Sequence, residues 1–365
     1  MQSQEVKSVT FLKKLTRMRL FLPVFSMFLV MAVNIVFDLA KGNVFYNFFT
    51  ITIKNGVLYG RLVDILNRGS EAAILAIGMT LVVSASAGAD ISVGSVMSLA
   101  GGVCCMLLAG FGNVNVSQYA VPLWAGIGAG ILVACLCGAF SGFLVSYMNI
   151  QPMVATLILF SAGRALGLLL CNSMIVYIRV PSFRLFGGYA GIFPTPILIA
   201  GACVAVMALI LKFTALGMYV QSVGINAKAA RIAGYQSKRI IFTAFVISGL
   251  CAGIAGIVAT SRIYSADTNN IGLGLELDAI LAVALGGNSL GGGKFRFSGS
   301  IIGAFTIQAI TTTLLTLGIS SAQAPVFKAI IVILIVTIQA PAVKAYFLKR
   351  ASRKALKACK EAISA

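Results

Sequence analysis

Long apolar stretches alternate with short polar ones along almost the whole of this 365-residue chain. A helix that crosses the hydrocarbon core of a membrane needs about 20 mostly apolar residues. The pattern therefore predicts an all-α fold, a polytopic transmembrane helical bundle of about ten spans. The predicted spans are 20–37, 62–85, 92–110, 119–147, 152–171, 194–212, 240–262, 275–287, 298–317 and 323–343.

Two features of this pattern predict interrupted helices. The stretch 275–287 is short for a membrane span, and only the sequence Ser-Ala-Gly-Ala-Asp-Ile at 86–91 separates the second span from the third. The second of these places a carboxylate, Asp90, among glycine, alanine and serine inside a long apolar region. A charged group at the centre of a bilayer costs about 2.5–3.5 kcal/mol on insertion scales, so Asp90 requires an explanation.

The two interrupted regions also carry an internal repeat. Ala73–Ala76 recurs as Ala279–Ala282, and Gly94-Ser95-Val96 is followed 205 residues later by Gly299-Ser300-Ile301. Repeated halves with interrupted helices are typical of transporters, whose substrate route follows the interface between the halves.

Close helix packing is predicted by small residues at four-residue spacing. Lipid offers helices no hydrophobic reason to associate, so residues that let backbones approach one another take over that role. The fourth span carries an uninterrupted stripe of such residues, which consists of Gly126, Gly130, Ala134, Gly138, Gly142 and Ser146.

The charge of the chain agrees with a membrane protein whose two termini lie in the cytoplasm. Only 10% of the residues are charged, yet the net charge is +19. With the spans above, the cytoplasmic segments 1–19, 212–239, 287–297 and 344–365 hold 19 Lys and Arg residues, whereas the external segments hold 6. This asymmetry follows the positive-inside rule, so the charge needs no nucleic acid partner. The predicted organisation is a basic cytoplasmic N-terminus (1–19), a transmembrane domain (20–343) and a basic cytoplasmic tail (344–365) that lies on membrane lipid.

Enzyme chemistry and metal binding are not expected. The chain has no histidine, which removes the commonest general base and metal ligand. Its eight cysteines form no Cys-x-x-Cys pair and lie mostly in apolar runs. The sequence ending in Gly293-Lys294-Phe295 lacks the Ser or Thr and the preceding glycine of an ATP-binding Walker A loop, so no cofactor is predicted.

Ionisable residues within or beside the spans point to the interior of the bundle, where such groups usually pair. Arg164 lies deep in the fifth span, and we expect its partner to be Asp90. In the alternative, Asp90 caps the helix that starts near Ser92, because a carboxylate there accepts free backbone N–H groups. The remaining members of this set are Arg68, Glu71, Glu276, Asp278 and Lys328.

Four sequence stretches carry a resemblance to a known family. They are ILNRGSEAAILAIGMTLVVSASAGADISVGSVMSLAGG (65–102), QPMVATLILFSAGRALG (151–167), GINAKAARIAGYQSKRIIFTAFVISGLCAGIAGI (224–257) and SADTNNIGLGLELDAILAVALGGNSLGGGKFRFSGSIIGA (265–304). Through them the chain resembles the permease subunits of bacterial ABC sugar importers, the branch with ribose, xylose, arabinose and galactofuranose systems, and most of all the galactofuranose type. The family commonly has Gly-Gly-Ile-Asp-Leu-Ser-Val-Gly where this chain has Ala87-Gly-Ala-Asp-Ile-Ser-Val-Gly94.

The resemblance implies a division of labour in the bacterial inner membrane. The permease forms the path together with a second permease copy, a separate ABC ATPase subunit binds ATP, and a periplasmic sugar-binding protein delivers the substrate. Within the 212–239 loop, residues 226–234 resemble the short coupling helix that docks on the ATPase. The coupling residues are then Asn226, Lys228, Ala229, Ala230, Arg231 and Gly234.

The translocation path is expected to follow the polar residues of the interrupted helices. These candidates are Asp90, Ser92, Arg164, Asn269, Asn270, Glu276 and Asp278. Monosaccharides, nucleosides and other small polar solutes all remain open as substrates. An ion-coupled secondary sugar transporter is the main rival, although the absence of histidine disfavours a proton relay; a channel and a membrane-embedded enzyme are further alternatives.

Overall fold

The computed structural model describes residues 21–40, 50–54 and 56–339, and it divides into two compact units, Met1–Thr312 and Thr313–Ala365. Each of the ten predicted spans coincides with a helix, and the ends differ by a few residues. In the first unit these helices are α2 (Phe21–Ala40), α3 (Arg61–Ser86), α4 (Val93–Ala109), α5 (Leu123–Ser146), α6 (Pro152–Leu170), α8 (Thr195–Phe213), α11 (Ser237–Ile263), α12 (Leu275–Leu285) and most of α13 (Phe297–Thr316). The second unit contains the end of α13 and α14 (Ala324–Gln339).

In the part of the chain that the structure describes, six helices are long and apolar enough to cross a membrane, namely α3, α5, α6, α8, α11 and α13. The two helices beside the predicted interruptions are shorter: α4 has 17 residues and α12 has 11. At 1.5 Å per residue α12 is about 17 Å long, roughly half of a 30 Å hydrocarbon core. Interrupted helices are therefore present at both predicted places, whereas the count of ten membrane crossings stays a prediction.

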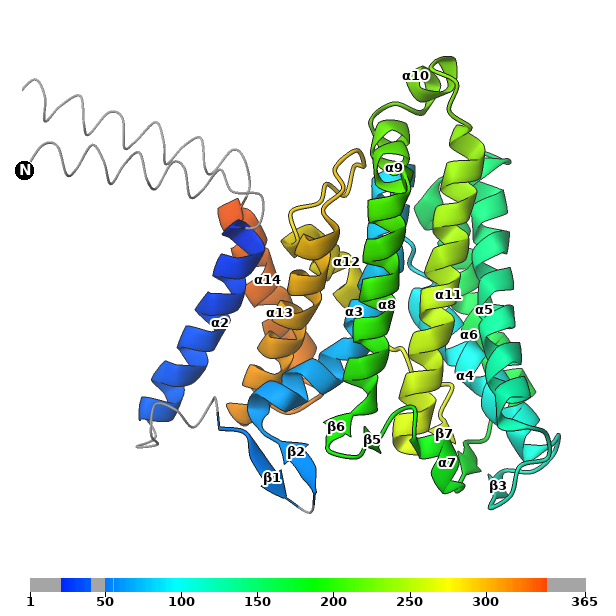
Figure 1. The fold of residues 1–365 in the computed structure, drawn as a ribbon, viewed down its shortest axis with the longest axis vertical. Helices are drawn as coiled ribbons and strands as arrows, with labels where there is room; N and C mark the ends of the chain where they lie inside the picture. The colour runs from blue at the N-terminus through cyan, green and yellow to red at the C-terminus, as the bar shows by residue number, and fades with distance from the viewer. Residues whose placement is uncertain (1–20, 41–49, 55, 340–365) are drawn as a thin grey trace, which may run out of the picture. The chain divides into compact units, whose positions relative to one another are not determined.

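Short strands show that the all-α expectation was incomplete. The hairpin β1 (Thr52–Lys54) and β2 (Val57–Tyr59) pairs antiparallel, as do β5 (Tyr189–Ala190) and β6 (Phe193–Pro194). In a third sheet, β4 (Val176–Ile178) pairs parallel to β3 (Asn115–Val116) and antiparallel to β7 (Ser265–Ala266). Such strands of two or three residues carry no hydrophobic period of their own, so the sequence pattern did not predict them. They lie at one end of the helices of the first unit, together with the short helix α7 (Pro181–Arg184) (Figure 1).

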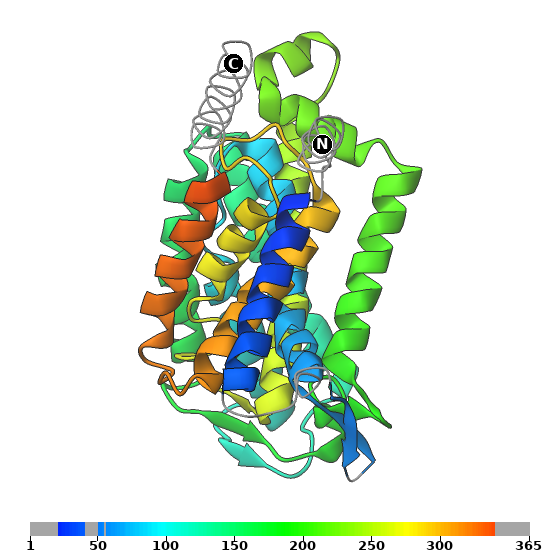
Figure 2. The same cartoon turned by 90° about the vertical axis from the view of Figure 1, so that its left-hand side faces the viewer.

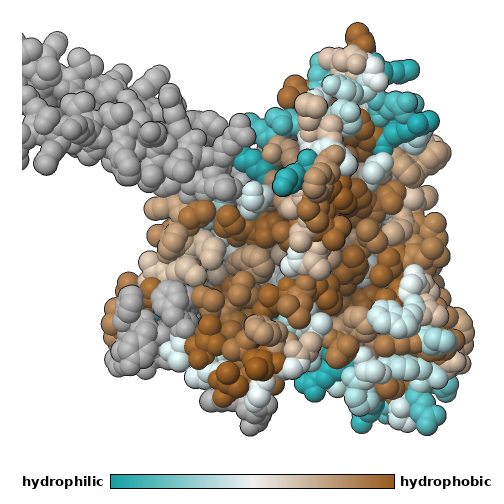
Figure 3. All heavy atoms as spheres, viewed as in Figure 1, coloured by the Kyte–Doolittle hydropathy of each residue, from teal (hydrophilic) through white to brown (hydrophobic). Residues whose placement is uncertain are grey.

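The opposite end of this unit carries two short helices within the predicted 212–239 loop, and the second of them lies in the stretch 226–234 that resembles a coupling helix. Residues 212–239 contain α9 (Leu216–Ile225) and α10 (Ala227–Ile232), and α10 is the element farthest from the strands (Figures 1 and 2). Hydrophobic residues cover the visible middle of α8, α11 and α5, and hydrophilic residues gather around α10 and around the strands (Figure 3). This distribution is the one expected of helices in a membrane with two wet ends.

Helix α3 is the centre of the first unit. It packs against α8, α9, α11 and α12, and 89% of its most apolar 18-residue window is buried, whereas only 17% of that of α8 is buried. Side chains of α3 such as Ile74, Leu75 and Met79 are almost completely enclosed. The ends of α3 therefore have fixed neighbours, and its C-terminal end leads directly into the segment that contains Asp90.

The small-residue stripe on α5 packs as the sequence predicts. A Cβ atom at Gly130 would lie 2.6 Å from the Ala100 carbonyl oxygen, and one at Gly138 would lie 2.5 Å from the Phe245 carbonyl oxygen. Helix α5 thus approaches the backbones of both α4 and α11, which are its main neighbours. Side chains larger than hydrogen at these positions would push the helices apart.

Replacing one of these glycines tests the packing. Gly138→Ala should lower the thermal stability of the purified protein in detergent, because overpacking costs about 1–3 kcal/mol. Gly128→Ala on the same helix is the matched control, since nothing lies within 4 Å of a Cβ atom there. A control variant that loses as much stability as Gly138→Ala would show that the stripe has no special role.

Candidate functional site

The segment 87–92 interrupts the chain between α3 and α4. Ala87 ends α3 in the left-handed conformation, with φ 55°. This is the position at which the resembling family commonly has glycine, the residue that adopts such a φ without strain. In this chain alanine therefore adopts the left-handed conformation that glycine favours. The segment that follows leads to the start of α4 at Val93.

Asp90 is the organising side chain of this segment. It is 3% exposed, and its Oδ1 accepts hydrogen bonds from the backbone N–H of Ser92 (3.0 Å) and from the Ser92 hydroxyl (2.6 Å). Its Oδ2 accepts a hydrogen bond from the hydroxyl of Ser248 on α11, at 2.9 Å. The Asp90 carboxylate thus satisfies a backbone N–H group at the start of α4 and connects the 87–92 segment to α11.

Arg164 does not pair with Asp90, so the predicted ion pair is wrong. The hydrogen bonds and ion pairs of residues 21–40, 50–54 and 56–339 include none between these two side chains. Arg164 Nη1 instead donates to three carbonyl oxygens, those of Thr268 (3.3 Å), Asn269 (2.6 Å) and Ile271 (3.4 Å). The Arg164 guanidinium therefore donates hydrogen bonds to backbone carbonyl groups rather than to the Asp90 carboxylate.

These carbonyls belong to the non-helical segment between α11 and α12, here called the 264–274 segment. The Ser98 hydroxyl on α4 donates to the Thr268 carbonyl at 2.7 Å, and a Cβ atom at Gly94 would clash with the Gly272 carbonyl and the Glu276 carboxylate. Ser98 on α4 and Arg164 on α6 thus hold the 264–274 segment beside the beginning of α4. The absence of a side chain at Gly94 is what permits this approach.

The seven predicted path residues fall into three groups in the structure. Asp90 and Ser92 lie at the start of α4, and Glu276, which is 5% exposed, lies beside Gly94 there. Arg164 holds the backbone of the 264–274 segment, on which Asn269 and Asn270 are exposed. Asp278 is buried in the first turn of α12.

A second break, residues 286–296 between α12 and α13, has a polar centre that the sequence analysis missed. Asn288 is 8% exposed, its Oδ1 accepts from the backbone N–H of Arg296 (2.6 Å), and its Nδ2 donates to the Ser300 hydroxyl (2.8 Å). Arg296 directly precedes α13, as Ser92 directly precedes α4. At each break a buried Asx side chain thus accepts the N–H of the residue just before the next helix.

The predicted coupling residues form α10, a helix closed at both ends. The Asn226 side chain accepts hydrogen bonds from the backbone N–H groups of Lys228 and Ala229, both at 3.0 Å, and so caps the N-terminus. At the other end the Gly234 N–H bonds the Arg231 carbonyl and the Tyr235 N–H bonds the Ala230 carbonyl, with φ 90° at Gly234. This is a Schellman motif, as expected of a glycine that ends a helix.

The exposed surface of α10 differs in part from the expectation. Lys228, Ala229 and Arg231 are exposed, but Ala230 is 6% exposed and packs against the chain itself, so its side chain offers nothing to a partner. Ile232, which the sequence analysis did not select, is 89% exposed. Ile232 is the largest apolar side chain in the stretch 226–234, which was the available signal.

A close junction connects α10 to both breaks. Gly224, two residues before the Asn226 cap, lies so near the Ser84 carbonyl that a Cβ atom would collide with it, and such an atom would lie 2.7 Å from the Gly293 nitrogen. The Gly293 N–H donates to the Ser84 carbonyl at 3.2 Å, and the Ser84 hydroxyl donates to the Lys294 carbonyl at 2.9 Å. The end of α3, the end of α9 and the 286–296 segment therefore meet at one place, called the Ser84 junction below.

Comparison with known proteins extends these observations. Residues 61–338 match the family described as the permease component of the branched-chain amino acid transport system. The chain is 43% identical over 295 residues to the galactofuranose transporter permease protein YtfT of Escherichia coli K12, which covers 80% of this chain and 83% of that protein. It is 36% identical to the fructose import permease protein FruF of Bifidobacterium longum (85% and 86% covered) and 34% identical to the ribose import permease protein RbsC of Escherichia coli K12 (80% and 87% covered).

Double-mutant cycles on thermal unfolding in detergent test the partner of Asp90. Asp90→Ala and Ser248→Ala should be coupled by about 0.5–3 kcal/mol, because their side chains share a buried hydrogen bond. Asp90→Ala and Arg164→Ala should instead add to within about 0.5 kcal/mol. Strong coupling to Arg164 together with additivity to Ser248 would contradict the described hydrogen bonding.

Proposed function

The chain belongs to the permease family that matches residues 61–338, with sugar-importer permeases among its relatives, and on this premise we propose how it moves a monosaccharide across the membrane. In this proposal it forms the translocation path of an ABC importer with a second permease copy. A separate ATPase subunit binds ATP, and a periplasmic binding protein delivers the sugar, so the chain itself is not an enzyme.

Helix α10 is the observation that carries the proposal. It is a one- to two-turn helix with both ends capped, so its shape does not depend on a partner. It presents two basic side chains, Lys228 and Arg231, and one almost fully exposed apolar side chain, Ile232. A rigid protrusion with an apolar anchor and surrounding charge is suited to docking in a cleft of an ATPase.

The Ser84 junction supplies a route from that docking helix to the path. A displacement of α10 moves Gly224, which has no space to move independently of Ser84 and Gly293. Ser84 lies three residues before Ala87, where the break that contains Asp90 begins. We therefore propose that ATP-driven movement of α10 changes the 87–92 and 286–296 breaks together. Asp90 and Asn288 have similar roles at the two breaks, although the two residues do not align in the internal repeat predicted from the sequence.

The proposed sidedness places α10 in the cytoplasm, because Lys and Arg are concentrated in the 212–239 region. The strands then lie at the outer end, where the binding protein docks. We propose an inner-membrane location, ten spans, and cytoplasmic termini at 1–19 and 344–365; these terminal segments lie outside the described residues. The exposed apolar faces of α5, α6 and α8 are available to lipid and to the second copy.

The polar residues near the breaks fit a neutral, hydroxyl-rich substrate. The path candidates combine carboxylates, amides, a hydroxyl and one guanidinium, which together offer both donors and acceptors. Relatives are named for galactofuranose, fructose and ribose, and we propose a monosaccharide of this class. A nucleoside or another small polar solute is the alternative within the same ABC mechanism.

Reconstitution tests the proposal. Proteoliposomes that contain the chain, its ATPase subunit and external binding protein should accumulate radiolabelled sugar only when ATP is present, and the purified chain alone should hydrolyse no ATP. Uptake driven by a sodium or proton gradient without the ATPase would overturn the proposal in favour of a secondary transporter.

The junction makes a sharper prediction. Gly224→Ala should lower ATP-dependent uptake at least tenfold, because the new methyl group cannot fit beside the Ser84 carbonyl without displacing the end of α3. The control is Gly201→Ala on α8, where nothing lies within 4 Å of a Cβ atom, and its uptake should equal that of the unmodified protein. Normal uptake by Gly224→Ala would show that the junction does not couple α10 to the path.

A further inference from the structure

A cavity of about 260 Å³ lies between α3, α4, α11 and the 264–274 segment. Arg262, one of its lining residues, is the penultimate residue of α11, so part of the cavity lies at the end of α11 that leads to strand β7. Non-helical backbone at membrane depth is tolerated where it is buried in protein or lines a water-filled space. The 264–274 segment meets this condition by lining the cavity with its residues 267 and 270–273.

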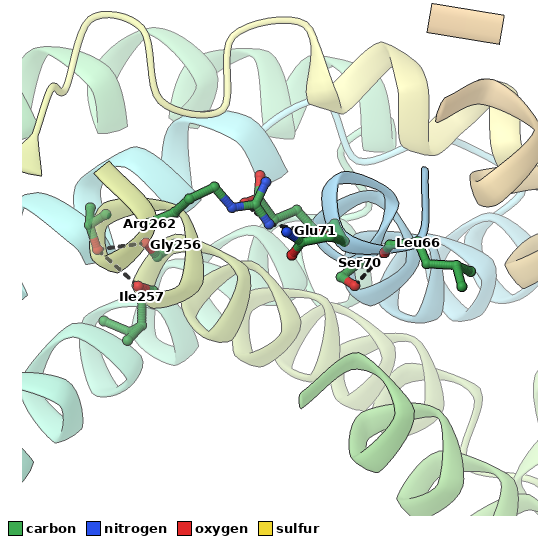
Figure 4. A network of polar contacts seen from close by, with 8 residues as sticks. Leu66, Ser70, Glu71, Gly256, Ile257 and Arg262 are labelled. Atoms are coloured by element: carbon green, nitrogen blue, oxygen red, sulfur yellow. Dashed lines mark hydrogen bonds and ion pairs between the residues drawn. The ribbon is translucent and has the colours of Figure 1, made fainter. Parts of the chain in front are cut away.

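One wall of the cavity is an ion pair. Arg262 Nη2 lies 3.2 Å from Glu71 Oε1 on α3 and donates to the Asn67 carbonyl at 2.8 Å (Figure 4). Among the residues that the structure describes, the buried Nε of Arg262 has no hydrogen-bond partner. A buried donor without a partner costs roughly 1–3 kcal/mol, which a polar ligand that reached this atom would offset.

Another part of the cavity lining is formed by the 264–274 segment. The Asp267 carboxylate accepts hydrogen bonds from the backbone N–H groups of Asn269 and Asn270 and from the Asn270 Nδ2, the last at 2.6 Å. This fixes the Asn270 side chain at the cavity while leaving its amide oxygen available. Apolar surface completes the lining, from Met97, Ala259, Ile263, Ile271, Leu273 and Leu275.

We propose that this cavity is a binding subsite for a neutral monosaccharide on its way into the path. The inference rests on the proposed transport function and adds to it the place at which the permease itself holds the sugar. In this proposal Arg262 and Asn270 bind hydroxyl groups, and the apolar side chains contact the C–H face of the ring. The cavity is smaller than the roughly 300–1,000 Å³ usual for drug-sized ligands, so it selects a small molecule.

Charge favours a neutral ligand over an ionic one. Two carboxylates, Glu71 and Asp267, line the cavity and disfavour an anion, and Glu71 is already neutralised by Arg262. A cation would compete with that guanidinium for the same carboxylate. Neutral hydroxyl groups are not repelled by the carboxylates and do not compete with Arg262 for Glu71. They both donate and accept hydrogen bonds, so they can use the donors and the acceptors of the cavity.

Direct binding to the purified permease in lipid nanodiscs tests the subsite. Radiolabelled D-ribose, D-fructose and D-galactose serve as probes, and ribose 5-phosphate serves as the anionic comparison. At least one neutral sugar should bind saturably, and the phosphorylated sugar should bind at least tenfold more weakly. Absence of saturable binding for all three neutral sugars would overturn the inference.

Two exposed amide side chains provide a pair of variants. Asn270→Ala should weaken binding of the best sugar about tenfold, whereas Gln118→Ala should leave it unchanged, because Gln118 is exposed but does not line the cavity. Since both side chains are exposed, both variants should keep the melting temperature of the unmodified protein. Equal affinities for the two variants would assign the bound sugar to another place and refute the subsite.

The outcomes for subsite and transport function are separable. ATP-dependent import in proteoliposomes without saturable binding to the permease would remove the subsite and leave the transport function intact. Saturable, Asn270-dependent binding without ATP-dependent import would retain the subsite and refute the importer function.

Discussion

Backbone N–H and C=O groups that leave a helix inside an apolar bundle have no water to bind and must find partners within the protein. Three non-helical segments of the first unit, 87–92, 264–274 and 286–296, are built around this requirement. Asp90 accepts the Ser92 N–H at the 87–92 break, Asn288 accepts the Arg296 N–H at the 286–296 break, and Arg164 donates to carbonyls of the 264–274 segment. Polar side chains that are costly in a membrane thus permit irregular backbone inside the helical bundle.

Small residues let these irregular segments pack closely against the rest of the protein. Gly94 admits the Gly272 carbonyl and the Glu276 carboxylate, and Gly224 admits the Ser84 carbonyl. Without these close approaches the irregular segments would contact lipid or leave voids. The glycines therefore determine where segments distant in sequence meet. The polar side chains provide hydrogen-bond partners for the backbone N–H and C=O groups of those segments. Together they join the capped helix α10 to both breaks through a chain of direct contacts.

The sequence predicted the elements better than it predicted their partners. Apolar length alone located ten helices, because burial in lipid or protein requires it, and the residues around Asp90 indicated a break. The partner of Asp90 was misassigned because opposite charge favoured Arg164, whereas Ser248, 158 positions away, is one of many serines and carries no distinguishing pattern. Arg164 binds backbone carbonyl groups. Because every residue has one, the sequence does not indicate which carbonyl groups an arginine will bind. On α10, Ala230 was selected as a coupling residue but is buried, and Ile232 was not selected but is exposed, since a six-residue helix has too few residues for a periodic pattern.

Hydrogen–deuterium exchange on the assembled transporter tests the central claim most directly, that docking at α10 and the irregular segments form one mechanical unit. The account predicts that a nonhydrolysable ATP analogue changes amide protection in residues 226–234, 87–92 and 286–296 together, while the middle of α5 stays unchanged. A change confined to residues 226–234, with both breaks exchanging as before, would contradict it.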